Sequence, residues 1–82
     1  MNELMEKLAK REHERWASWM IYLFSRCEVQ EDGGLLIPAV WVKRWQRQIE
    51  IDYPCLTEDE QESDRKEART SLDIIAKYLS EI

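Results

Sequence analysis

The sequence predicts a mainly α-helical fold in one domain, residues 1–82, with three helices and a short β-hairpin packed on them. Three observations predict this class. Residues 2–26 contain neither Gly nor Pro, so a long helix meets no breaker there. The two Gly of the chain are adjacent, at 33 and 34, and mark one tight turn. Thr57, three residues before Glu60, is a helix-start signature.

The first predicted helix, residues 2–26, carries one apolar stripe. Its members recur at alternating spacings of four and three, which places them on one helical face. They are Ala9, His13, Trp16, Met20, Leu23 and Cys27. Lys7, Lys10 and Arg11 belong to the polar face and are expected in solvent.

A hairpin is predicted at residues 27–37, because the turn formers at 31–34 precede the apolar run 35–37. The second helix is predicted at residues 38–50. Pro38 suits a first helical turn, and Trp41 and Trp45 fall on one face of the helix. Tyr53-Pro54 prevents the helix from continuing.

The third helix is predicted at residues 57–81. Thr57 and Glu60 form a capping box, and the acidic residues 58–60 face the positive end of the helix dipole. The apolar stripe of this helix contains two polar positions at its start. Its members are Gln61, Asp64, Ala68, Leu72, Ile75 and Leu79.

Composition limits the class of protein. Four Trp and 44% hydrophobic residues are enough for a globular fold, and the aromatic side chains are expected to supply much of its core. A net charge of -5 argues against binding a nucleic acid polymer, which requires Lys and Arg to neutralise phosphates. No segment suits a signal peptide or a membrane span, so we expect a cytoplasmic protein.

Two Cys and one His are too few for a zinc site from one chain, so no metal and no cofactor is predicted. Catalysis is not predicted either. His13 with Asp64 could form a base and its orienting group, but none of the Ser residues lies in a nucleophile-elbow context. Cys27 has no evident activating partner.

Polar residues on apolar stripes are the candidates for function, because burying them costs a few kcal/mol unless they are paired. One interpretation is a buried network in which Asp64 accepts hydrogen bonds from His13, from Arg47 or from a Trp indole N–H and fixes the register of the helices. The other is a ligand site in which aromatic faces stack a base and guanidinium groups bind phosphate. Its candidate residues are His13, Trp16, Trp45, Arg47, Tyr53, Asp64 and Arg65.

Four segments, taken in order, carry a family resemblance: His13-Glu14-Arg15-Trp16, Trp45-Gln46-Arg47-Gln48, Tyr53-Pro54-Cys55-Leu56, and the stretch from Leu56 to Arg65. Over residues 12–76 the chain resembles the ryanodine-receptor repeat domain in its stand-alone bacterial and phage form. The resemblance implies a helical, non-catalytic module, proposed in prokaryotes to recognise nucleotide-derived ligands in phage–host conflict. The positions that match are His13, Trp16, Trp45, Arg47, Asp64 and Arg65.

Three functional hypotheses follow. The first is a module that binds or sequesters a small anionic, nucleotide-derived signal such as a cyclic nucleotide, in a bacterium or a phage-infected cell. The second is an acidic protein-interaction module, or a phage-encoded inhibitor of a host protein, that docks through Trp19, Tyr22 and the acidic start of the third helix. The third is a homodimer that covers spare aromatic surface, with a ligand site across its interface.

Overall fold

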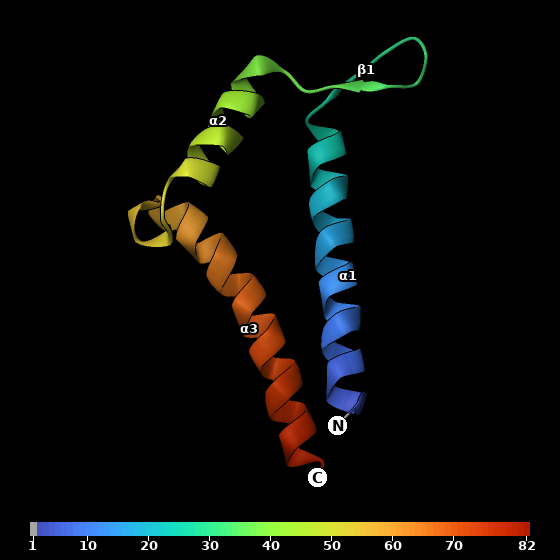
Figure 1. The fold of residues 1–82 in the computed structure, drawn as a ribbon, viewed down its shortest axis with the longest axis vertical. Coiled ribbons are helices and arrows are strands. Elements are labelled where there is room, and N and C mark those ends of the chain that lie inside the picture. Colours follow the sequence, from blue (N-terminus) through green and yellow to red (C-terminus); the bar gives the residue numbers. More distant parts are fainter. Residues whose placement is uncertain (1) are drawn as a thin grey trace.

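The computed structural model describes residues 2–82 and confirms the predicted class: three helices and a two-stranded antiparallel hairpin (Figure 1). A one-turn 3-10 helix, η1, is the element that the sequence did not predict. The elements are α1 (Asn2–Ser25), β1 (Glu28–Val29), β2 (Leu35–Leu36), α2 (Ala39–Glu50), η1 (Tyr53–Cys55) and α3 (Glu58–Ser80). The helix boundaries lie within two residues of the predicted ones.

The hairpin reverses the chain between α1 and α2. Glu28 pairs with Leu36, and Val29 pairs with Leu35. Gly33 has a φ of 87°, a left-handed conformation in which Gly has no Cβ to clash. The backbone N–H of Gly34 donates to Asp32 Oδ1 at 2.8 Å and closes the turn. The hairpin packs only slightly on the helices, since residues 28–37 are all exposed.

The capping box at the start of α3 is confirmed. The backbone N–H of Glu60 donates to Thr57 Oγ1 at 3.2 Å, and the backbone N–H of Thr57 donates to Glu60 Oε1 at 3.0 Å. Pro38, the predicted first residue of the second helix, is the N-cap of α2, so the helix begins one position later than predicted. The chain turns from α2 into α3 through η1, whose second residue is Pro54.

The three helices lie in one flat layer, in which the end of α2 meets the start of α3 (Figure 1). In this view α1 and α3 run in opposite directions and converge toward the two chain ends, while α2 joins them at the wide end. The molecule measures 52 × 35 × 16 Å. Its radius of gyration is 16.6 Å, whereas a compact domain of this length has about 12 Å.

The expectation of an aromatic core inside one chain is wrong. In residues 2–82 no apolar side chain is buried, and sixteen large apolar or aromatic residues are exposed. The one buried residue of this part is Arg11, which was expected in solvent and instead forms an ion pair with Glu67 between α1 and α3. A single layer of helices has nothing to pack against on its two faces, and this explains the missing core.

Candidate functional site

An aromatic cluster joins the C-terminal half of α1 to α2. It consists of Trp19, Tyr22, Trp41 and Trp45. Trp19 stacks on Tyr22 with ring centroids 5.4 Å apart and meets the edge of Trp45 at 5.7 Å. Tyr22 lies edge-on to Trp41 at 6.3 Å. These offset and edge-to-face geometries are the favourable ones for aromatic pairs, so the cluster fixes the angle between the two helices.

Two guanidinium groups lie over this aromatic cluster. Arg26 lies 5.3 Å from the ring centroid of Tyr22 and 5.5 Å from that of Trp41, and Arg44 lies 5.5 Å from Trp41. Within residues 2–82 neither Arg26 nor Arg44 forms an ion pair with a carboxylate. The cluster therefore presents aromatic faces beside positive charge that no acidic side chain neutralises.

A second group of polar side chains, the corner network, holds α2 against the start of α3. It consists of Arg47, Gln48, Glu58, Glu60, Gln61, Glu62 and Arg65. Arg47 and Gln48 both donate to Glu60 Oε2, the Gln48 bond measuring 2.7 Å. Gln61 Nε2 donates to the carbonyl oxygen of Tyr53 at 2.8 Å and so ties η1 to the network.

Arg65 is the centre of the network on α3. Its guanidinium donates to Glu58 Oε1 at 2.8 Å, to Glu62 Oε1 at 3.2 Å and to Gln61 Oε1 at 3.1 Å. The hydrogen bonds from Arg65 to Glu58 and Glu62 raise the pKa of Arg65 above its usual value. Two of the three hydrogen-bond partners of the Arg65 guanidinium are thus carboxylates of the same helix.

Hydrogen bonds lower the pKa of two carboxylates in the network. The bond from the backbone N–H of Thr57, together with those from Gln48 and the Thr57 hydroxyl, lowers the pKa of Glu60 to about 2. Arg47 adds a smaller coulombic contribution in the same direction. The pKa of Glu62 is lowered by hydrogen bonds from Arg69 and Arg65. Glu58, Glu60 and Glu62 are therefore paired within the chain, which leaves less free charge at the acidic helix start than the sequence suggested.

The seven predicted site residues do not come together. Trp45 belongs to the aromatic cluster, and Arg47 and Arg65 belong to the corner network. Tyr53 contributes its carbonyl oxygen to that network while its residue stays 44% exposed.

The remaining three lie elsewhere on the two long helices. His13 and Trp16 neighbour each other on α1, with ring centroids 5.9 Å apart, and both are exposed. Asp64 is also exposed. The predicted buried network of His13, Arg47 and Asp64 is therefore wrong: Arg47 pairs with Glu60 instead.

A third feature is an apolar face on the layer formed by α1 and α3. The side of α1 toward α3 contains Leu4, Leu8 and Arg11, all at least half-buried, and the side of α3 toward α1 contains Ser71 and Ile74, both half-buried. Successive residues of a helix turn by about 100°. By this count, the centre of the apolar stripe lies about 100° around the helix axis from the side that contacts the other helix. The direction of this rotation is the same in α1 and in α3.

The two stripes consequently share a face. Because α1 and α3 run in opposite directions, the same sense of rotation brings both stripes to one side of the layer (Figure 1). The apolar face is defined by six exposed side chains, those of the two stripes together with Met5, one turn before Ala9: Met5, Ala9, Trp16, Ala68, Leu72 and Leu79. The exposed polar residues His13 and Asp64 lie on the same two stripes. Met5, Trp16, Leu72 and Leu79 are each 58 to 61% exposed.

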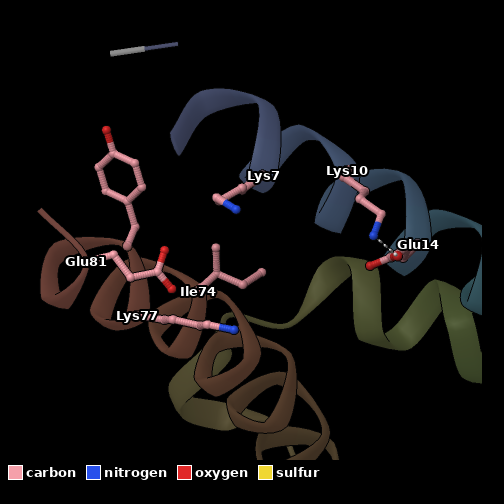
Figure 2. Close-up of a pocket in the computed structure, with 7 residues that line it drawn as sticks. Lys7, Lys10, Glu14, Ile74, Lys77 and Glu81 are labelled. Atoms are coloured by element: carbon pink, nitrogen blue, oxygen red, sulfur yellow. Dashed lines mark ion pairs between the residues drawn. The ribbon is translucent and has the colours of Figure 1, made fainter. Parts of the chain in front are cut away.

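The opposite side of the layer is charged. An open groove of about 310 Å³ runs there between the N-terminal part of α1 and the C-terminal part of α3 (Figure 2). Its lining includes Lys7, Lys10 and Glu14 from α1 and Lys77 and Glu81 from α3. Lys10 and Glu14 form an ion pair at 3.6 Å. At this end of the molecule the layer thus has one charged face and one apolar face.

Residues 2–82 contain no candidate metal site and no candidate membrane-spanning helix. Within residues 2–82 no three His, Cys, Asp or Glu side chains are grouped to hold a metal ion. Cys27 and Cys55 are both free thiols. In this same part of the chain, no helix combines the length and the apolar character needed to cross a bilayer.

Comparison of the chain with protein-family models, with curated proteins and with solved structures finds no match. The resemblance to the ryanodine-receptor repeat domain therefore rests on the four sequence segments alone.

Sequence reasoning missed three parts of these sites. Arg26 and Arg44 were not among the seven candidate site residues, although Arg26 follows Tyr22 by one helical turn and Arg44 follows Trp41 by three residues, spacings that place side chains on one face. Glu60 was assigned to the helix cap but also binds Arg47 and Gln48. Arg11 was assigned to solvent, because a charge beside Lys10 gives no sign that it points inward.

Proposed function

We propose that the chain is a non-catalytic protein-interaction module that completes its hydrophobic core by binding a protein partner. One observation carries the proposal: within residues 2–82 no apolar side chain is buried. Helices of this length owe most of their stability to packing of an amphipathic face, and here the apolar face is open.

The apolar and aromatic character of the open face supports a protein partner. Large exposed apolar patches on soluble proteins mark interaction sites, and aromatic residues are enriched among the anchors of protein interfaces. Trp16 is such an anchor at the middle of α1, with aliphatic side chains of α3 on the same face. A polar face on the other side of the layer gives the module one binding side.

Dye binding and unfolding of the chain as a monomer test the proposal. At a dilution at which the chain is monomeric, we expect it to bind the dye ANS and to unfold without a cooperative transition. A Trp16→Lys variant is expected to bind less dye. A monomer that unfolds cooperatively and binds no dye would refute the proposal, because such a monomer has no need of a partner.

A second candidate function is binding of a small anionic, nucleotide-like ligand at the aromatic cluster. The observation that favours it is the pair of guanidinium groups, Arg26 and Arg44, beside Trp41 without carboxylate partners. A base could stack on an indole while the guanidinium groups bind phosphate. This places the site away from Arg47 and Arg65, the arginines proposed from the sequence.

Calorimetric titration with mono-, di- and cyclic nucleotides tests this second function. We expect Arg44→Gln to weaken binding by about tenfold or more, since hydrogen bonds to charged groups contribute about 1.5 to 3 kcal/mol. Lys43→Gln is the matched control: it removes one positive charge from the neighbouring exposed position of α2. Absence of heat with every nucleotide would exclude the ligand class.

A further inference from the structure

We infer, building on the proposed interaction function, that the partner is a second copy of this chain, which packs its apolar face against the apolar face of the first. The unit that folds stably is then a two-layer homodimer, and the single chain is half of its core. The inference depends on three features: the excess surface of the chain, the shape of the layer, and the distribution of charge.

The excess surface matches what a stable dimer buries. The chain exposes 6834 Å². A compact monomer of this size exposes about 5,200 Å², so roughly 1,600 Å² is in excess. Two copies that each cover this excess bury about 3,200 Å² between them, which lies within the range of about 2,000 to 5,000 Å² typical of obligate homodimers.

The shape of the layer suits stacking on itself. The molecule is 16 Å thick but 52 Å long and 35 Å wide. A second layer of helices at a packing distance of about 10 Å would bring the thickness to about 26 Å and give a globular body. Two-fold symmetry places the same face on both sides of the interface, so a single apolar face is enough.

The positions of the charged residues are compatible with packing of the two apolar faces. Each chain carries a net charge of -5, so two copies repel each other. None of the six residues that define the apolar face is charged, and Asp64, near the start of α3, is the charged member of its two stripes. Lys7, Lys10 and Glu14 line the opposite face. Face-to-face packing therefore keeps most of the charged groups in water, and salt screens the repulsion that is left.

Sedimentation equilibrium over a range of protein concentrations tests the inference, with Leu72→Glu as the disruptive variant. Leu72 is 61% exposed in the single chain, so the substitution leaves the contacts within that chain in place. We expect wild type to have the mass of two chains. By symmetry the variant places two charges in the interface, which should raise the dissociation constant by about 100-fold or more.

Thr70→Glu is the matched control. It adds the same charge to an exposed position of α3 that lies two residues from Leu72 and therefore off the apolar face. The control should sediment as wild type does. A dimer that Leu72→Glu weakens and Thr70→Glu leaves intact supports the inference.

Two outcomes would overturn it: a wild-type mass of one chain at every concentration, or an assembly that Leu72→Glu does not weaken. Dye binding separates this failure from that of the proposed function. A monomer that binds ANS still requires a partner, which is then another protein. A monomer that unfolds cooperatively without binding dye removes both proposals together.

Discussion

Replacing Trp16 by Ala measures whether the apolar face is covered. A buried Trp removes up to about 250 Å² from water. In the single chain Trp16 is 58% exposed, so folding of that chain covers roughly 100 Å² of it. At about 25 cal/mol per Å², and allowing for a compact denatured state, the loss on truncation is about 2 kcal/mol.

The assembled protein should respond more strongly. If a second copy covers Trp16, its truncation deletes a fully buried aromatic side chain, for which about 3 to 5 kcal/mol is usual. This loss of unfolding free energy applies to each chain, and a two-fold dimer contains two truncated side chains. We therefore expect the Trp16→Ala dimer to be destabilised by about 6 to 10 kcal/mol, enough to dissociate and unfold it.

Urea unfolding followed by far-UV circular dichroism at two protein concentrations supplies the measurement. The urea midpoint of wild type should rise with protein concentration, whereas the midpoint of Trp16→Ala should no longer depend on protein concentration. Trp45→Ala serves as the comparison, since Trp45 is half-buried within the chain by Trp19 and Trp41. A loss of no more than about 2 kcal/mol per chain for Trp16→Ala in the assembled protein would refute the argument that its face is covered.

Three further results are expected. Thr57→Ala removes the side-chain acceptor of the α3 cap and should lower stability by about 1 kcal/mol in urea unfolding, while Thr57→Ser, which keeps the hydroxyl, should stay near wild type. Because folding lowers the pKa of Glu60 from 4.5 to about 2, its contribution is complete above pH 4.5 and is lost as the pH falls toward 2; acid titrations should show a weaker pH dependence for Glu60→Gln, and an unchanged one would contradict the assignment. Gly33→Ala should destabilise by about 1 to 2 kcal/mol, since the φ of 87° is unfavourable for a residue with a Cβ, and thermal unfolding that matches wild type would show that the turn adjusts freely.

The sequence predicted the elements because their signals are local. The absence of Gly and Pro before Ser25, the Gly33-Gly34 turn and the Thr57–Glu60 box each act over a few residues, and each is present in the structure. The capping box was predicted with both of its hydrogen bonds. Helix length and order followed from these signals without any knowledge of packing.

The site could not be predicted to the same extent, because periodicity shows which residues share a face but not which element covers that face. His13 and Asp64 were correctly placed on apolar stripes, yet both stripes face away from the contact between α1 and α3. Arg11 is buried at that contact although it lies on the polar side of the stripe. Only the rotation of the helices about their axes decides between these arrangements.

The convergence of α1 and α3 toward the chain ends has a consequence for protein engineering. The start of α1 and the end of α3 lie together at the narrow end of the layer, far from the hairpin (Figure 1). A polypeptide whose ends are neighbours can be inserted into a surface loop of a host protein through short connectors. Grafted in this way, the module would tether its host at one tip and leave the whole length of both long helices free for recognition.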